Sequence, residues 1–310
     1  MLPKTVVKFE LRNPLVYLDP LNVNMANLYV ELLKDSLTEY SYMAELAGLK
    51  YSISATNYGL NLSLSGFSDK MHVLLETVVE RMASLKIDPQ RFNILKESYT
   101  RNLINFEAEQ PYKHAVYYVT LLISEKGWNK QQLLDCVNDF TVEDLQAFIP
   151  KLLTQNIFIE SLVFGNVTQQ RAKDFMHTVE AKLTHSTSFK LRPLCKSQLK
   201  NLRQIQLPEA SSFVFLKNNT IHKTASIEVY LQCGMQSTKD NALVELFCQV
   251  INESSFNVLR TQEQLGYIVA SGVRNFGGAQ GVRLIVQSDR SPAFLDERIE
   301  NFIKLTKVIL

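Results

Sequence analysis

The sequence has few of the residues that build a metal or catalytic site. Its 310 residues include only 5 histidines and 4 cysteines. No two cysteines form a CxxC pair, which argues against both a structural zinc site and a disulfide framework and favours a reducing compartment. The histidines form no HExxH and no complete HxxEH motif, the patterns that place zinc ligands on one helical face. A self-sufficient hydrolytic zinc centre is therefore not expected.

One segment comes close to HxxEH. His177 and Glu180 match the first histidine and the glutamate of the motif, but Ala181 stands where the second histidine ligand is needed. His177 and Glu180 are i, i+3 neighbours on a predicted helix, so a solvated surface pair is the ordinary interpretation. We expect no metal ligands in this chain.

Signatures of nucleophilic catalysis and of phosphate binding are also missing. No serine lies in a GxSxG motif, and Cys248 lies in the apolar run LVELFCQVI, where packing in a core is expected. Gly277 and Gly278 lie between predicted strands without a GxxxxGK motif, which predicts a hairpin turn. The residues alone indicate no autonomous catalytic centre.

Neither charge nor long apolar runs point to nucleic acid or to a membrane. The 33 Lys and Arg against 31 Asp and Glu leave a formal charge of +2, so no field of one sign is expected. No run approaches the roughly 18 uninterrupted apolar residues of a membrane span, and the start lacks the pattern of a secretory signal. We expect a soluble, cytoplasmic protein with no nucleic-acid and no membrane partner.

Two successions of predicted elements resemble each other. The first is a strand at 4–11, a helix at 25–46, a hairpin from Tyr51 to Leu64 and a helix ending near Leu85. The second has the same order, and VELLKDSL in the first matches VELFCQVI in the second. Its elements are a strand at 224–232, a helix at 240–251, a hairpin from Tyr267 through Gly277, and a helix from Pro292. The chain therefore predicts two copies of one α+β unit.

Further elements are expected between and beside these copies. They are helices at 89–107, 111–125, 130–138, after Thr141 and from Thr168 to Leu183, strands at 156–164 and 212–217, and a linker at 185–208. The expected fold class is α+β, with two homologous α/β-roll domains, each a mostly antiparallel sheet covered by helices. The second copy lacks the later helices and the closing strand of the first, so we expect it to be incomplete.

The run FNVLRTQEQLGYIVASG joins a predicted helix end to a strand. Arg260 offers five fixed donors and Tyr267 a phenolic donor, a pairing suited to peptide carbonyls or to a developing oxyanion. The alternative is structural, with Arg260 paired to Glu263 and Tyr267 packed at a strand edge. The residues by themselves favour that structural interpretation.

Three stretches carry a resemblance to a known family. ELFCQVINESSFNVLRTQEQLGYIVASGVR, NFEAEQPYKHAVYY and PLVYLDPLNVNMANLYVELLKDSLTEYSYMAELAGLKY resemble the insulysin type of the inverzincin zinc metallopeptidases, and the resemblance covers essentially all 310 residues. It implies four homologous α/β domains in two halves that close around a chamber, with HxxEH in the first domain. It identifies residues 1–207 as the third, non-catalytic domain and residues 208–310 as the amino-terminal part of the fourth, substrate-binding domain.

The resemblance also assigns roles to residues. It implies that Arg260 and Tyr267 are catalytic residues that hold the substrate backbone and stabilise the tetrahedral intermediate. Phe256 matches an aromatic residue of the substrate pocket, with core packing as an equally open alternative. Ser254 and Ser255 replace a Pro-Cys pair of the vertebrate type, so the thiol sensitivity attributed to that cysteine is not carried over.

Two functions follow from these observations. In the first, the chain is part of a zinc metalloendopeptidase that degrades small peptides such as insulin-like hormones, and it shapes the chamber and supplies substrate contacts. Zinc is then expected in the full-length enzyme, on ligands outside this chain, and this chain alone is expected to be inactive. The expected partners are peptide substrates and the missing amino-terminal half, and a homodimer is left open. The alternative is a truncated, non-catalytic binding module that pairs with a full-length relative.

Overall fold

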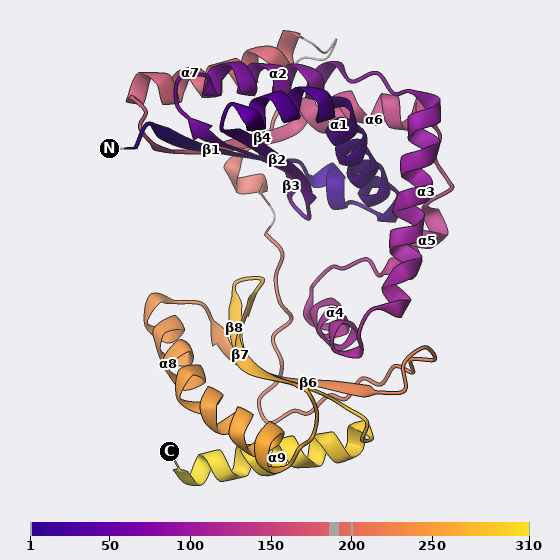
Figure 1. Ribbon diagram of the computed structural model, residues 1–310, viewed down its shortest axis with the longest axis vertical. Helices are drawn as coiled ribbons and strands as arrows, with labels where there is room; N and C mark the ends of the chain where they lie inside the picture. The colour runs from indigo at the N-terminus through magenta and orange to yellow at the C-terminus, as the bar shows by residue number, and fades with distance from the viewer. Residues whose placement is uncertain (1, 186–191, 200, 310) are drawn as a thin grey trace. The chain divides into compact units, whose positions relative to one another are not determined.

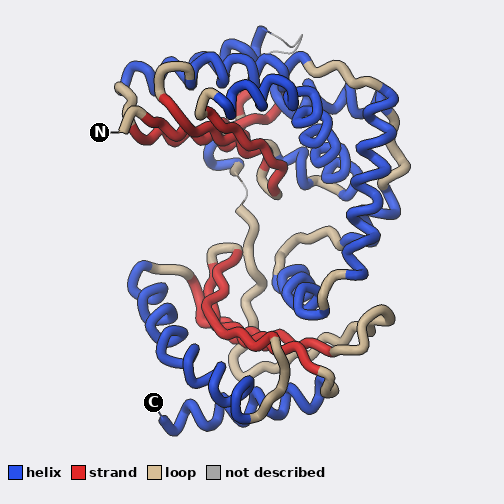
Figure 2. The backbone as a smooth tube through the Cα atoms, in the orientation of Figure 1, coloured by secondary structure: helices blue, strands red, loops and turns tan. Residues whose placement is uncertain are grey.

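The structure is a computed structural model that describes residues 2–185, 192–199 and 201–309. The chain divides into two compact units (Figure 1). Unit 1 comprises residues 1–104 and 128–200, and unit 2 comprises residues 105–127 and 201–310. Both units combine helices and strands (Figure 2). Most strand pairs are antiparallel, and the expected α+β fold class is confirmed. Residues 186–191 and 200 of the predicted linker lie outside the described residues.

The strands of unit 1 are β1 (Lys4–Arg12), β2 (Leu49–Thr56), β3 (Gly59–Phe67), β4 (Gln155–Gly165) and β5 (Arg192–Pro193). They form a five-stranded sheet with the order β2-β3-β1-β4-β5. The pairs β1/β3, β1/β4 and β2/β3 are antiparallel, and the short β5 adds to β4 in parallel. The predicted strands at 4–11 and 156–164 and the predicted hairpin are confirmed.

The first long helix begins five residues before its predicted start. The Asp19 side chain accepts a hydrogen bond from the Asn22 backbone N–H, and Pro20 occupies the first turn, so the helix begins at Pro20. The helix predicted after Thr141 is also present, and Thr141 and Asp144 form a capping box at its start. The helices from this part of the chain are α1 (Pro20–Leu46), α2 (Met71–Ser84), α3 (Pro89–Asn105), α5 (Lys130–Cys136), α6 (Val142–Thr154) and α7 (Gln169–His185).

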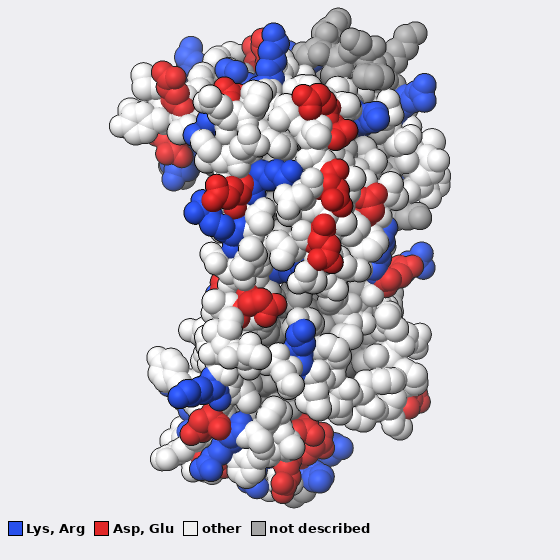
Figure 3. All heavy atoms as spheres, turned by 90° about the vertical axis from the view of Figure 1, so that its right-hand side faces the viewer, with Lys and Arg blue, Asp and Glu red and all other residues white. Residues whose placement is uncertain are grey.

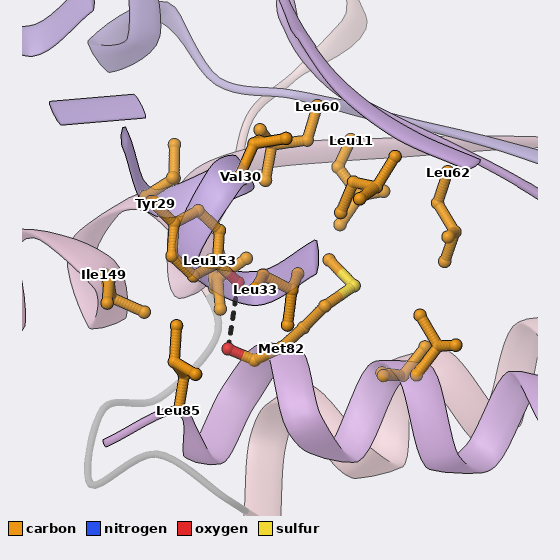
Figure 4. Close-up of a cluster of buried hydrophobic side chains, with 14 of the residues drawn as sticks. Leu11, Tyr29, Val30, Leu33, Leu60, Leu62, Met82, Leu85, Ile149 and Leu153 are labelled. Atoms are coloured by element: carbon orange, nitrogen blue, oxygen red, sulfur yellow. Dashed lines mark hydrogen bonds between the residues drawn. The ribbon is translucent and has the colours of Figure 1, made fainter. Parts of the chain in front are cut away.

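Alternate residues of the strands in unit 1 point into one apolar core. Val7, Phe9 and Leu11 of β1 are each at most 2% exposed and pack against α1 and α2 side chains. Tyr29 is fully buried among them, and its hydroxyl donates to the Met82 carbonyl oxygen over 2.9 Å (Figure 4). Burial raises the pKa of Tyr29 far above its ordinary value, so the phenol stays a donor in this core.

The elements of unit 2 are α4 (Pro111–Ile123), β6 (Ala225–Met235), α8 (Thr238–Ser255), a π-helix (Phe256–Gln262), β7 (Ile268–Phe276), β8 (Ala279–Ser288) and α9 (Pro292–Ile309). The three strands form an antiparallel sheet with the order β6-β8-β7. Leu284 and Val286 point into a core with Leu295 and Ile299 of α9, whereas Arg274 reaches α4 on the opposite face. This opposite face of the sheet is thus covered by a helix that comes much earlier in the chain.

The predicted internal repeat is present in the topology. In unit 1, β1 pairs with the second strand of the β2/β3 hairpin, and in unit 2 β6 pairs in the same way with the second strand of the β7/β8 hairpin. Both copies run strand, helix, hairpin, helix. The expected division into domains at residues 1–207 and 208–310 stays a prediction. The two compact units are defined by contacts and do not test it, since unit 2 includes α4 from the first of these ranges.

The strand predicted at 212–217 is wrong. These residues have no regular secondary structure, and Phe213, Val214 and Leu216 are 71%, 77% and 74% exposed. Their aromatic and β-branched composition gives a high strand propensity, but a strand also needs a neighbour that takes up its backbone hydrogen bonds. The strand of this unit nearest in sequence, β6, pairs with β8 instead.

Charged side chains form no field of one sign on the face drawn in Figure 3, where basic and acidic residues are interspersed among uncharged ones. This distribution agrees with the formal net charge of +2. In the described part of the chain, no helix combines the length and the apolar character that crossing a membrane requires.

Candidate functional site

The predicted site residues lie where α8 leads into β7. The α8 helix begins at a Ser237 cap whose side chain accepts from the Asp240 backbone N–H, and it ends at Ser255. The chain then widens into a π-helix over Phe256–Gln262. Single π-helical turns are rare and occur frequently at functional sites, because the extra residue per turn reorients the side chains around it.

Two buried leucines fix this turn to the core of unit 2. Leu259 is fully buried and Leu265 is 4% exposed, and both pack with Val286 of β8 and Leu295 of α9. The Leu265 backbone N–H also donates to the Leu259 carbonyl oxygen over 3.0 Å. Since the leucines occupy the inner side of the turn, Phe256, which is 44% exposed, and Tyr267, which is 84% exposed, remain on the outer side.

The connection to β7 depends on one glycine. A Cβ atom on Gly266 would lie 1.9 Å from the carbonyl oxygen of Gln287, so only glycine allows this close approach to β8. Two residues earlier, Gln264 adopts a left-handed conformation with φ of 51°, which is uncommon for a residue with a side chain. Together these two positions turn the chain sharply and place Tyr267 directly before the first residue of β7.

The structure brings Phe256, Arg260 and Tyr267 together. The guanidinium carbon of Arg260 lies 4.7 Å from the centroid of the Phe256 ring and 4.7 Å from the centroid of the Tyr267 ring. An exposed cation–π contact contributes about 0.5–1 kcal/mol, so two rings restrict the Arg260 side chain appreciably. Its five N–H donors and the Tyr267 phenol are thereby held on one surface of unit 2.

The structural interpretation paired Glu263 with Arg260, but in the structure Glu263 pairs with Arg298. Glu263 accepts two hydrogen bonds from Arg298 of α9, over 2.8 Å from Nε and 2.5 Å from a terminal nitrogen. These hydrogen bonds raise the pKa of Arg298 above its ordinary value. Sequence reasoning missed Arg298, because it lies 35 residues after Glu263 and nothing in the local pattern marks it as a partner. The pair holds the site loop, residues 263–267 between the π-helix and β7, against α9. Arg260 contacts the two rings instead of Glu263.

Shallow hollows border the site along α8. The larger one, about 610 Å³, is lined by Gln249, Asn252, Glu253, Phe256, Asn257 and Thr261. The smaller one, about 330 Å³, lies between α8 and β7 and shares Gln249 and Asn252 with the larger one. Sequence reasoning missed these polar residues. The sequence pattern that could have identified them is their spacing, because positions 249, 252, 253 and 257 fall on one exposed helix face.

The other candidate residues play structural roles. Cys248 is 5% exposed and packs with Ile251 and Val282, so its predicted core role is confirmed. His177 and Glu180 are exposed on α7, as predicted for a solvated pair. Within residues 2–185, 192–199 and 201–309, no group of three or more His, Cys, Asp or Glu side chains is placed to hold a metal ion. The described residues therefore do not fit a zinc site.

A buried ion pair lies on the other face of the unit 2 sheet. Arg274 donates to Glu228 over 2.7 Å, and their side chains are 7% and 0% exposed. Arg274 also donates to the Thr120 hydroxyl over 2.5 Å, which connects the sheet to α4. Burial raises the pKa of Glu228 above its ordinary value, although the charges of Arg274 and Arg283 oppose this shift. Sequence reasoning did not identify this pair.

Comparisons with known proteins agree with these features. Curated relatives include the insulin-degrading enzyme of Homo sapiens, 49% identical over 97% of this chain, and that of Drosophila melanogaster, 44% identical over 97%. A putative zinc protease of Schizosaccharomyces pombe is 37% identical over 96% of the chain. The chain spans only 29% to 30% of the length of these relatives. The predicted resemblance is thus confirmed.

A solved structure shows the fold, and family models show the family. The crystal structure of pitrilysin has the same fold, with a TM-score of 0.87 at 22% identity. The match covers 99% of this chain and 32% of the pitrilysin chain. The family model described as the middle or third domain of peptidase M16 matches residues 1–136. Because the model described as the peptidase M16 inactive domain matches residues 139–309, more than half of the sequence, the chain belongs to the M16 peptidase family.

Proposed function

We propose that this chain is part of an M16 metalloendopeptidase and holds peptide substrates through Arg260 and Tyr267. The observation that carries the proposal is the contact of the Arg260 guanidinium with both the Phe256 and Tyr267 rings, at 4.7 Å from each centroid. Tyr267 is 84% exposed, so its phenol is available to a ligand. Side chains whose only role is packing in the core would not contact one another on the outer surface of unit 2.

The chemistry of these groups suits a peptide undergoing hydrolysis. When a peptide bond is attacked, negative charge develops on its carbonyl oxygen, and donors fixed in advance stabilise that charge without reorganisation. Arg260 brings a permanently charged fork of donors, and Tyr267 brings one neutral donor. Phe256 borders the larger hollow and provides an apolar contact for a substrate side chain. The three residues then act as a clamp that stabilises charge.

The hydrolytic centre is assigned to residues outside this chain. The described residues do not fit a zinc site, and the relatives include a putative zinc protease. We therefore propose that zinc is bound by the amino-terminal half of the complete enzyme, which is the partner of this chain. Small peptides such as insulin-like hormones are the proposed substrates, because relatives at 44% to 49% identity are named insulin-degrading enzymes.

Domain assignment and location belong to the same proposal. Residues 1–207 are proposed as the third domain and residues 208–310 as part of the fourth, since residues 201–224 contain no helix and no strand. The ranges of the two family models meet near residue 137 instead, within the first of these regions. A cytoplasmic location is proposed because Cys136, Cys195, Cys233 and Cys248 are all free thiols.

The proposal is tested by mixing this chain with the separately produced amino-terminal half and measuring cleavage of a fluorogenic peptide. Arg260→Ala and Tyr267→Phe are each expected to lower kcat by about 10²–10³, the usual loss for one oxyanion donor. Zinc content of the mixture is expected to stay unchanged. Arg290→Ala is the matched control, because Arg290 also lies over a ring, that of Phe294 at 6.0 Å, but outside the site.

Wild-type turnover in both variants would overturn the proposed roles. The same measurement separates the alternative function, in which the chain is a non-catalytic module that pairs with a full-length relative. That alternative predicts association of the chains with no cleavage in the mixture of the two halves.

A further inference from the structure

We propose that the free edge of β7 pairs with the backbone of an extended peptide, and that this peptide carries a Lys or Arg side chain over α8. The inference rests on the proposed function in one respect, since it takes the bound molecule to be a peptide. It adds a binding surface that continues from the clamp formed by Phe256, Arg260 and Tyr267.

Among the residues that the structure describes, the outer edge of β7 pairs with no other strand, which leaves backbone groups unpaired. All nine residues of β7 pair with β8 on one side, and β7 ends the strand order β6-β8-β7. In an antiparallel sheet, alternate residues of such a strand direct their N–H and C=O groups away from the sheet. These groups are a ready template for an added strand, which is one of the recurring ways in which proteins bind extended peptides.

The edge of β7 also lacks the usual protection against pairing. Proteins block exposed edges with charged residues, above all lysine, and with proline. The corresponding edge strand of unit 1, β2, carries the exposed Lys50 in its second position. By contrast, the first six residues of β7, Ile268–Val273, contain neither a charge nor a proline. This difference between two copies of one unit indicates that the β7 edge is kept open.

Small side chains leave room at the middle of β7. A Cβ atom on Gly272 would meet no heavy atom within 4 Å, and Ala270 is exposed. The Ser271 hydroxyl is held towards α8 by hydrogen bonds with Ser255 at 2.8 Å and Asn252 at 3.3 Å. Glycine in a strand often marks the close approach of another backbone. A peptide strand therefore meets no bulky side chain there.

The charges beside the edge select the peptide. The hollow of about 330 Å³ lies between β7 and α8 and continues into the larger hollow along α8. Glu245 and Glu253 line these hollows, and the other lining side chains are uncharged. A cationic side chain on the peptide complements these carboxylates, whereas an acidic one is repelled. Because β7 starts beside Tyr267, a peptide on this edge passes the clamp.

The first test is a scan of N-methylated peptides. A labelled ten-residue peptide with one central lysine is titrated with the full 310-residue chain, and binding is followed by fluorescence anisotropy. Each N-methyl group removes one backbone donor, so methylation at every second residue is expected to weaken binding about tenfold, with little loss in between. Losses without a period of two would overturn strand pairing, because contacts through side chains alone have no reason to alternate.

The second test locates the peptide on the protein. Alternate backbone amides of β7 are expected to exchange rapidly with deuterium in the free chain and slowly in the complex. Glu245→Gln and Glu253→Gln are each expected to weaken binding about three- to tenfold at low salt, and less at high salt. Glu300→Gln, an exposed position on α9, is the control and should bind as wild type. Unchanged exchange of every β7 amide would overturn the proposal.

A second copy of this chain is the competing occupant of the edge. The proposal fails if three results occur together: the chain sediments as a dimer, peptide binding leaves that dimer intact, and the β7 amides are protected before peptide is added. The second copy would then occupy the edge.

Failure of the proposed function would give a different result. Arg260→Ala and Tyr267→Phe would then leave turnover in the reconstituted enzyme unchanged, while the period of two in the binding scan would persist.

Discussion

The guanidinium carbon of Arg260 lies 4.7 Å from the Tyr267 ring centroid, although six residues and a sharp turn lie between them in the chain. The contact exists because the π-helix holds Arg260 half-buried at the surface while Leu259 and Leu265 are buried beneath it. Gly266 then lets the chain approach the Gln287 carbonyl oxygen of β8. The geometry of the clamp is thus set by backbone positions next to it as well as by its own side chains.

Gly266→Ala is therefore expected to disturb both stability and the clamp. The new Cβ atom would lie 1.9 Å from the Gln287 carbonyl oxygen, so backbone atoms must move. Overpacking of this kind costs about 1–3 kcal/mol in the free energy of unfolding. Urea denaturation measures that loss, and turnover in the reconstituted enzyme is expected to fall along with it because Tyr267 is displaced from Arg260.

Gly272→Ala is the matched control, since a Cβ atom there meets no heavy atom within 4 Å. Its backbone lies in a strand, where alanine loses less conformational freedom on folding than glycine, so stability is expected to stay the same or to rise by about 0.5–1 kcal/mol. Equal losses for both glycines would show that the contact with β8 does not require glycine at 266.

Glu263→Gln tests whether the ion pair with Arg298 positions the site loop. The two side chains are 19% and 32% exposed, so the expected loss in unfolding free energy is below about 1 kcal/mol. A larger effect is expected on kcat than on KM, because the loop carries the groups that stabilise developing charge. Glu97→Gln, in the exposed pair with Arg101 at 4.0 Å, should change neither quantity. A fall in stability with normal kcat would assign the pair to folding alone.

The elements that the sequence predicts correctly are those with a clear period. The alternation of Val7, Phe9 and Leu11 and the helical spacing of Leu28, Leu32 and Leu33 both correspond to buried faces in the structure. Local capping at Thr141 was also predictable, because its partner Asp144 lies three residues away. These features depend on neighbours along the chain.

The features that were missed depend on partners far away in sequence. The residues at 212–217 have strand propensity but form no strand, and Glu263 pairs with Arg298 rather than with the nearby Arg260. Arg274 meets Thr120 from α4 across 154 residues. No local pattern encodes such contacts. At the site, Arg260 and Tyr267 were identified by resemblance, and the contact of Arg260 with two rings is visible only in three dimensions.

Tyr99→Phe should change stability at alkaline pH. Burial raises the pKa of Tyr99 from 10.0 to about 12, and its hydroxyl donates to Asn24 over 2.9 Å. The folded state therefore holds this proton more tightly than the unfolded state. The resulting stability is fully present below about pH 10 and is lost as pH rises towards 12. Urea denaturation at pH 8 and pH 10.5 should show a smaller alkaline loss in Tyr99→Phe than in wild type.

At neutral pH the same variant should be less stable by about 0.5–1.5 kcal/mol, since the hydrogen bond to Asn24 is lost. Tyr42→Phe, on a side chain that is 63% exposed, is the matched control and should retain the alkaline slope of the wild type. An identical slope in Tyr99→Phe and wild type would contradict the role assigned to Tyr99.

The buried pair of Arg274 and Glu228 should affect stability far more than a surface pair of the same unit. Arg274→Ala leaves the Glu228 carboxylate buried without its partner, which is expected to cost about 3–5 kcal/mol in the free energy of unfolding. Arg203→Ala breaks the pair with Glu125, whose side chains are 80% and 58% exposed, and should cost less than about 1 kcal/mol. The double variant Arg274→Met with Glu228→Gln removes both charges and should recover much of the loss.

Because Arg274 also donates to Thr120, hydrogen exchange in α4 should rise in Arg274→Ala. Unchanged exchange in α4 would show that Arg274 does not hold α4 on the sheet.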